Sequence, residues 1–227
     1  MTFTESSLQS TGTSAIDNSL KAPVLVFMLS GLKWLIFASL IGYLASWKSH
    51  NQEFLNGWAF LTTGRVQAVY TAAFVYGFGC NLAFASGLWL VARLSGTVIK
   101  HSLALIIAAV FWNIALTVGV VGIFMGDLQV FEFLELPSYV AYPLLISSLV
   151  VSVWGIMCLK ERTHSDLYAS QWFLVAAFLA FPWIQIVAQI MLVENPVPGV
   201  AQALVASWFA GNLVWLWFGG IAVAGLY

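Results

Sequence analysis

The sequence predicts an all-α integral membrane protein built as a bundle of six transmembrane helices. Of its 227 residues, 61% are hydrophobic and only 7% are charged, against about 25% in an average soluble domain. Eight Lys and Arg with nine Asp and Glu cannot cover a soluble fold of this size. The composition therefore excludes a soluble globular domain, a disordered protein and a nucleic-acid binder that relies on a basic surface.

Six apolar runs are each long enough for a helix that crosses a bilayer, which takes about 20 residues. They do not alternate with a period of two, which argues against barrel strands, and a helix pairs its own backbone groups in lipid. In chain order, the expected helices are Val24–Ser46, Val66–Ala92, Ser102–Met125, Ser138–Leu159, Ser170–Val193 and Val200–Tyr227. Residues 23–227 are therefore expected to form one transmembrane domain that is surrounded by lipid.

The two ends of the chain differ in character. Residues 1–22 are polar and rich in Ser and Thr, without the basic start, short apolar centre and cleavage site of a secretory signal. We expect them to form a disordered polar tail. The last apolar run reaches Tyr227 without a polar or basic flank, so we expect the chain to be the front part of a longer protein.

The positions of the basic residues indicate the orientation of the chain in the membrane, because cytoplasmic loops are enriched in Lys and Arg. Most of them fall on the side of the N-terminal tail. On that side lie Lys21, Arg93, Lys100, Lys160 and Arg162, and on the other lie Lys48 and Arg65. This asymmetry predicts a cytoplasmic N-terminus.

Small residues recur every four positions in the second expected helix, at Gly79, Ala83 and Gly87, and again at Gly122 and Gly126 in the third. Such stripes let a second helix approach closely. Packing within one bundle is the favoured interpretation, and a dimer interface is the alternative.

Polar residues inside the expected spans are few. Lys33 falls near the middle of the first span, where a charge costs roughly 2.5–3.5 kcal/mol. It is either a proton-relay or partner-contact lysine, or a lysine whose stem reaches toward the interface. The remaining polar residues, expected to hydrogen bond between helices, are Asn81, Asn113, Gln185, Gln189 and Asn212.

Residues that bind metals are poorly placed. The three histidines, His50, His101 and His164, fall in or beside loops, and Cys80 and Cys158 fall inside apolar runs. The sequence therefore predicts no haem, copper or zinc site made by these side chains, and no disulfide framework. Every Asp and Glu lies outside the span interiors, which argues against an ion-coupled transporter.

Two long stretches carry a resemblance to a known family. They are GRVQAVYTAAFVYGFGCNLAFASGLWLVAR at Gly64–Arg93 and SWFAGNLVWLWFGGIAVAGLY at Ser207–Tyr227, with shorter matches in YASQWF at Tyr168–Phe173 and ELP at Glu135–Pro137. Together they resemble the catalytic subunit I of haem–copper cytochrome c oxidases, closest to the cbb-type branch. The resemblance implies the bundle of that family's first six spans and a place in the inner membrane of a bacterium.

The departures from the family pattern concern the metal ligands. In the second span, the family has a histidine that ligates the low-spin haem, where this chain has Tyr70. In the sixth span, the family has a histidine that ligates copper, where this chain has Gly211. A tyrosine can ligate haem iron, but a neutral phenol is a poor ligand until its proton is removed.

Other positions of the family pattern are retained, and we expect them to maintain the packing of the bundle. These are Arg65, Thr71, Gly79, Asn81, Trp208 and Asn212. The resemblance thus implies a respiratory electron-transport relative with a degenerate site, without haem or copper in this chain, and with a structural or assembly role beside other oxidase-like subunits.

Two alternatives are open. The chain is the front half of an active oxidase that reduces oxygen with cytochrome c as donor and carries haem b, or it is a small-solute transporter. In the latter case Lys33, Gln185 and Gln189 would line the path.

Overall fold

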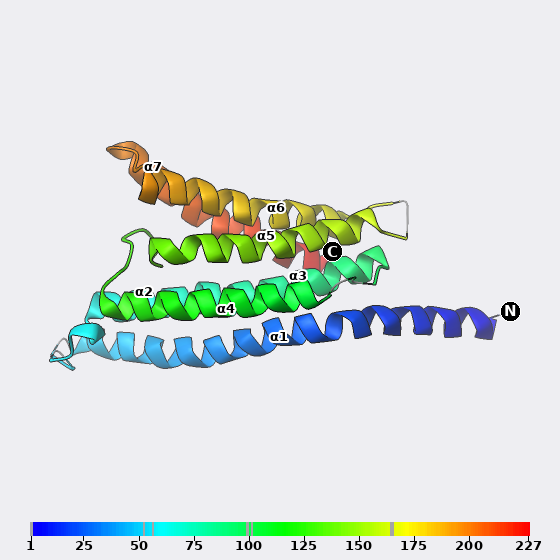
Figure 1. Cartoon of the computed structure of the whole chain (residues 1–227), viewed down its shortest axis with the longest axis horizontal. Coiled ribbons are helices and arrows are strands. Elements are labelled where there is room, and N and C mark those ends of the chain that lie inside the picture. Colours follow the sequence, from blue (N-terminus) through cyan, green and yellow to red (C-terminus); the bar gives the residue numbers. More distant parts are fainter. Residues whose placement is uncertain (1, 52, 56, 99, 101, 164–165) are drawn as a thin grey trace.

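The computed structural model describes residues 2–51, 53–55, 57–98, 100, 102–163 and 166–227, with side chains from residue 14 onward. Within these ranges, six helices are long and apolar enough to cross a membrane. The prediction of an all-α bundle of six transmembrane helices is therefore confirmed (Figure 1).

The described spans agree with the expected ones to within a few residues, except for the first. The first span is α1 (Thr2–His50), and the second joins α2 (Thr63–Ala72), η2 (Ala73–Gly79) and α3 (Cys80–Ser95). The third and fourth are α4 (Ser102–Met125) and α5 (Ser138–Lys160). The fifth joins α6 (Ala169–Ala188) to η3 (Gln189–Glu194), and the sixth joins α7 (Val200–Asn212), η4 (Leu213–Phe218) and α8 (Gly219–Leu226). A short 3₁₀ turn, η1 (Ala59–Leu61), precedes the second span.

Helix α1 begins well before the apolar run that we expected to start it. Residues 14–22, which we expected in a disordered tail, continue the helix. Ile16 and Leu20 are buried there, and the Asp17 carboxylate lies 3.0 Å from Nε of Arg93 at the end of α3. The described part of this segment differs from the expected tail because its apolar face packs on the bundle.

The helices pack in a sequence from one edge of the bundle to the other. Helix α1 packs on the second span and on α4, α4 packs on α5, α5 on α6, and α6 on the last span (Figure 1). Over an apolar stretch of 18 residues in each span, the first and last spans are the least buried, at 22% and 28%, against 44% to 56% for the others. These two spans form the outer edges.

Aromatic rings fill the interior where the second, third, fifth and sixth spans meet. The ring of Phe84 lies 5.1 Å from that of Trp112, 6.0 Å from that of Phe181 and 5.4 Å from that of Trp217. All four side chains are buried. Such edge-to-face clusters add to the dispersion contacts that hold helices together in lipid.

Small residues in the second span face rings of the fifth and sixth spans. A methyl group at Gly79 would lie 2.9 Å from Cζ of Phe218, and one at Gly87 would lie 3.1 Å from Cζ of Phe178. Gly155 of α5 contacts the other side of Phe178, where a methyl group would lie 2.6 Å from its ring. The stripe therefore lies against helices of the same chain.

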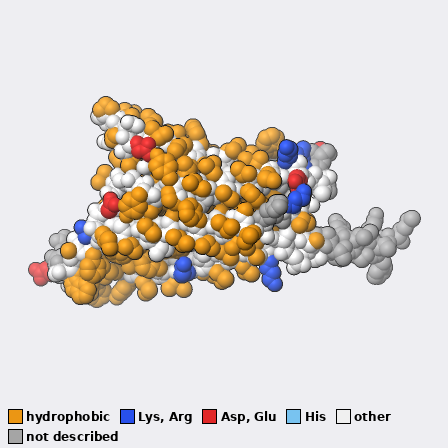
Figure 2. All heavy atoms as spheres, in the orientation of Figure 1, with side chains coloured by type: hydrophobic (Ala, Val, Ile, Leu, Met, Phe, Trp, Pro, Cys, Tyr) orange, Lys and Arg blue, Asp and Glu red, His pale blue; other side chains and the backbone are white. Residues whose placement is uncertain are grey.

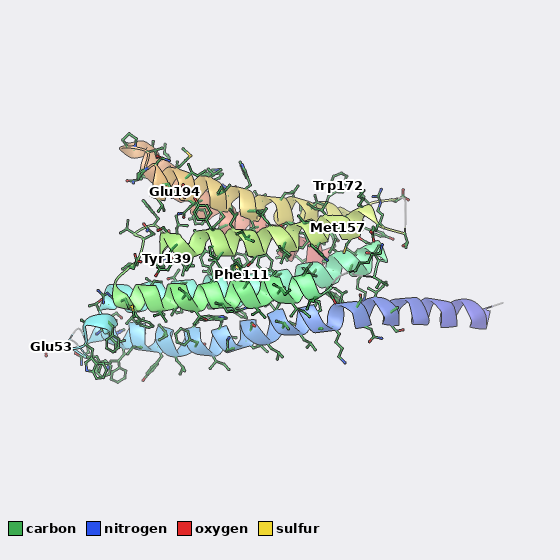
Figure 3. The ribbon with its side chains drawn as sticks, viewed as in Figure 1. Glu53, Phe111, Tyr139, Met157, Trp172 and Glu194 are labelled. Carbon is green, nitrogen blue, oxygen red and sulfur yellow. The ribbon has the colours of Figure 1, made fainter. Side chains whose placement is uncertain are left out.

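Apart from Lys33, which lies within the first span, most charged side chains lie toward the two ends of the bundle, and its flank is almost entirely apolar (Figure 2). At one end, Lys100 lies 3.0 Å from Glu161, and both line a small pocket with Met157, which Figure 3 labels at this end together with Trp172. At the other end lie Glu53 and Glu194 (Figure 3). The apolar flank between them is the surface expected of a protein embedded in lipid.

Candidate functional site

Tyr70 at the family haem-ligand position points at α1. A methyl group at Gly42 would lie 2.9 Å from Cε2 of Tyr70 and 3.0 Å from its Cδ2, so this edge of the ring contacts that glycine. The ring also stacks on Phe74, with 6.0 Å between centroids. Tyr70 thus lines a groove between the first two spans with a cavity volume of about 410 Å³, and Ser39 and Gln67 supply its polar rim.

Gly211 at the family copper-ligand position lies in α7, on the opposite edge of the bundle. A methyl group there would meet no atom within 4 Å. The segment α2 packs against α1 and α4, while α7 packs against α6 and the neighbouring parts of the fifth and sixth spans. Tyr70 and Gly211 therefore belong to two separate groups of packed helices.

A buried hydrogen-bond network joins the first three spans at the level of η2. Nε1 of Trp34 donates to Oδ1 of Asn113 at 2.8 Å. Nδ2 of Asn113 donates to Oδ1 of Asn81 at 3.1 Å, and Nδ2 of Asn81 lies 3.4 Å from Oδ1 of Asn113. Asn113 is thus the shared partner of two other helices.

The π-helical turn η2 supplies the carbonyl groups of this network. Nδ2 of Asn81 donates to the carbonyl of Gly77 at 2.6 Å, and Nε1 of Trp112 donates to the carbonyl of Tyr76 at 3.1 Å. A wide turn breaks the regular backbone ladder, so side chains can take its acceptors. The ring of Trp34 fits because Gly77 has no side chain, since a methyl group there would lie 2.6 Å from Cγ of that ring.

Arg65, which we expected to maintain packing, lies at the start of the second span and caps another helix. Its Nη1 donates to the carbonyl of Phe124 at 3.0 Å and to that of Ala59 at 2.9 Å. Phe124 is in the last turn of α4, where carbonyls have no partner within the helix and a cation is favourable. Arg65 therefore fixes the second span to the end of the third.

The loop between α4 and α5 folds over the same end of the bundle and contains Glu135. The hydroxyl of Tyr76 donates to the carbonyl of Phe133 in this loop. Burial raises the pKa of Glu135 from its usual 4.5 to about 7, and the negative charge of Glu132 adds to this, although the backbone N–H groups of Glu135 and Phe133 oppose it. Its Oε2 is buried with no hydrogen-bond partner among the described residues.

The fifth and sixth spans bury polar groups that they do not pair. Oε1 of Gln185, Nε2 of Gln189 and Nε1 of Trp217 have no hydrogen-bond partner within the described ranges. Asn212 donates to the carbonyl of Trp208 in its own helix at 2.7 Å, and the ring of Trp208 packs on Trp183. The expected hydrogen bonds between helices are thus found for Asn81 and Asn113, and the predicted pairing is wrong for these atoms of Gln185 and Gln189.

The residues that could hold a metal are not gathered. Among the residues that the structure describes, no group of three or more His, Cys, Asp or Glu side chains could hold a metal ion. His50 lies exposed at the end of α1, with Nδ1 3.0 Å from the carbonyl of Ser46. His101 and His164 lie outside the described residues.

The sequence alone missed three features of this region. Trp34 and Trp112 have no pattern that marks them as hydrogen-bond donors to η2, and the π-helical turn itself has no compositional marker. Glu135 was noted only within the ELP stretch, and its burial depends on how the loop folds over Tyr76.

Two curated proteins are similar to nearly the whole chain at low identity. "Cytochrome c oxidase subunit 1" of Rhodobacter capsulatus is 22% identical over 213 residues, which cover 87% of this chain and 38% of that protein. "Cytochrome c oxidase subunit 1 homolog" of Azorhizobium caulinodans is 24% identical over 201 residues, which cover 85% of this chain and 36% of that protein. No family model matches the chain.

The resemblance to cytochrome c oxidase subunit I is thus confirmed as a partial one, at low identity. The chain spans little more than a third of the length of the curated relatives that it matches. With membrane-spanning helices and bacterial relatives, it is a multi-pass bacterial membrane protein.

Proposed function

We propose that this chain is a structural or assembly subunit that keeps the helical bundle of an oxidase subunit I and holds neither haem nor copper with its own side chains. It acts in the bacterial inner membrane beside other oxidase-like subunits of the respiratory chain. The N-terminus is cytoplasmic, because the end of the bundle that includes Arg93 and Lys100 has the larger share of basic residues.

The observation that carries the proposal is the position of Tyr70. A haem ligand needs a donor atom directed at the iron and room for the porphyrin beside it. The Tyr70 ring instead lies against Gly42 of α1 and stacks on Phe74. No cationic side chain of the described residues lines the groove with it.

Gly211 supports the same conclusion by its chemistry. Glycine has no side-chain donor, so this position cannot ligate copper. The residues nearby in the same helix, Trp208 and Asn212, are committed to a ring contact and to a backbone hydrogen bond. The residues at both family ligand positions therefore do not fit the groups that the relatives' family would place there.

The test is a redox spectrum of the full chain, purified in detergent from membranes of a host that makes haem b. We expect no stoichiometric haem band in the reduced-minus-oxidised spectrum, and the same result for Tyr70→Phe. A stoichiometric b-type band that disappears in Tyr70→Phe would contradict the proposal. We also expect oxidase subunits to co-purify with the chain in detergent.

A second candidate is the front segment of an active terminal oxidase, in which the rest of the enzyme supplies the metal ligands. It is favoured by the extent of the similarity, since the matched region is little more than a third of each relative. Oxygen consumption with reduced cytochrome c, measured on membranes with and without this chain, separates the two. A loss of activity that Tyr70→Phe also causes would favour the enzyme.

A further inference from the structure

A groove between α1 and α4 has a lysine at its centre. Lys33 lines two adjoining cavities of about 360 and 380 Å³ along this helix pair. The first continues along Trp34, Phe37 and Phe124, and the second along Asn113 and Ile114. The groove is therefore apolar along its length and polar in the middle, as is typical of binding sites.

The lysine lies deep in the membrane. It faces the stretch of α4 around Asn113, which lies 11 residues after Ser102 and 12 before Met125, or roughly 17 Å from both ends at about 1.5 Å per residue. Phe111 marks the same level in Figure 3, halfway along the bundle. A lysine stem reaches only about 6 Å, so Lys33 cannot bring its ammonium to lipid headgroups from this level.

Lys33 is the cation of the groove, and its ammonium has no acceptor among the described residues. The amide of Asn113 is bonded to Trp34 and Asn81, and the hydroxyl of Thr117 donates to the carbonyl of Asn113 at 2.7 Å. The ammonium of Lys33 lies 5.7 Å from the ring centroid of Trp34, and no acceptor among the described residues hydrogen bonds to it. A molecule that enters the groove meets one positive charge, with the hydroxyl of Ser30 in the same cavity.

The side chains that the structure describes offer no counter-charge at this depth. The Asp and Glu residues with described side chains lie in loops, at helix ends or near the start of α1, and they are Asp17, Glu53, Asp127, Glu132, Glu135, Glu161, Asp166 and Glu194. Charges at mid-bilayer are typically paired with opposite charges. We propose that a transmembrane helix of another subunit docks between α1 and α4 and pairs a mid-bilayer Asp or Glu with Lys33.

Position and charge both favour a helix as the occupant. The groove opens at the first span, whose apolar 18-residue stretch is only 22% buried, and Leu29, Leu32 and Ile36 of α1 are exposed beside it. An incoming helix would cover these side chains, whereas a neutral quinone carbonyl would leave the lysine charge uncompensated. The groove contains neither Tyr70 nor Gly211, so a haem band in the redox spectrum would contradict the proposed function without affecting the docking of a helix at Lys33.

The test measures association of the full chain with model transmembrane helices in phosphatidylcholine vesicles at pH 8, by fluorescence energy transfer. The probes are Leu/Ala peptides about 23 residues long with a central Glu, Gln or Lys. We expect the Glu peptide to bind about tenfold more tightly than the Gln peptide. Lys33→Leu should abolish this preference, and Lys33→Arg and the matched control Lys21→Leu should keep it.

Reversing the charge at position 33 tests the same pairing with a second variant. The Lys33→Glu variant should no longer bind the Glu peptide preferentially and should instead bind the Lys peptide. Equal binding of Glu and Gln peptides, or a Glu preference that survives Lys33→Leu, would overturn the proposal. So would Lys33-dependent binding of ubiquinone in the same vesicles without any peptide preference, which would assign the groove to a quinone.

Discussion

The interior around η2 and the interior around η3 and η4 contain the same kinds of side chain and differ in how these are paired. Around η2, the amides of Asn81 and Asn113 and the indole of Trp34 form one network across three helices. In the fifth and sixth spans, Gln185 and Trp217 bury polar atoms without a partner in the described chain. Both interiors contain π-helical turns.

The difference shows what a polar residue contributes inside a membrane bundle. A paired amide stabilises contacts between helices, whereas an unpaired one costs desolvation and gains nothing. The first region is thus the fixed part of the bundle. The second region contains buried hydrogen-bonding atoms that have no partner in the described chain. It lies on the side of the bundle that includes the edge helix α7.

The largest expected effect is at the centre of the paired network. Asn113→Leu leaves Nε1 of Trp34 and Oδ1 of Asn81 buried without their partner. We expect the free energy of unfolding to fall by about 4 kcal/mol, because each stranded group costs about 2 kcal/mol. Unfolding in detergent, followed by circular dichroism, measures this, and a loss below about 1 kcal/mol would show that the network is not stabilising.

The next effect concerns Glu135, whose pKa is about 7 in the folded chain and 4.5 when exposed. Because the folded state binds the proton more tightly, stability is highest below about pH 4.5 and falls as the pH rises to about 7. The difference amounts to about 3 kcal/mol. Glu135→Gln should remove this pH dependence and Glu132→Gln should keep most of it, as measured by unfolding between pH 4 and 8.

A matched pair of glycines compares the two regions by size alone. Gly77→Ala places a methyl group 2.6 Å from the ring of Trp34, which should cost about 2 kcal/mol through overpacking. Gly211→Ala meets no atom within 4 Å and should gain up to about 1 kcal/mol from helix propensity. A Gly77→Ala variant as stable as Gly211→Ala would contradict the close packing of η2 on α1.

The smallest expected effect is in the unpaired region. Gln185→Leu removes a buried acceptor that has no partner in the described chain, so stability should stay within about 1 kcal/mol of the parent, on the stabilising side. The same unfolding assay applies. A loss near that of Asn113→Leu would mean that Gln185 is paired after all and that the two regions are alike.

The spans could be predicted from the sequence because hydropathy and length determine them. The third was expected at Ser102–Met125 and is found there, and the fourth and sixth differ by one residue. The start of α1 could not be predicted, since Ile16 and Leu20 look isolated until the rest of the bundle covers them. Helix boundaries in polar segments depend on such tertiary contacts.

The site could be predicted only in part. The sequence identifies Tyr70 and Gly211 as positions that lack a histidine, and it marks Asn81 and Asn113 as polar residues inside helices. It does not say that Trp34 donates to Asn113 or that Gln185 leaves its oxygen unpaired. Pairing depends on which faces of distant helices meet, and a single sequence does not encode that in any local pattern.

The most direct measurement is a titration of haem b into the purified full chain in detergent, followed in the Soret region for the parent, Tyr70→Phe and Tyr70→His. We expect no saturable binding to the parent beyond that of Tyr70→Phe, because the Tyr70 ring is held against Gly42. Tight binding of one haem per chain to the parent, lost in Tyr70→Phe, would contradict it.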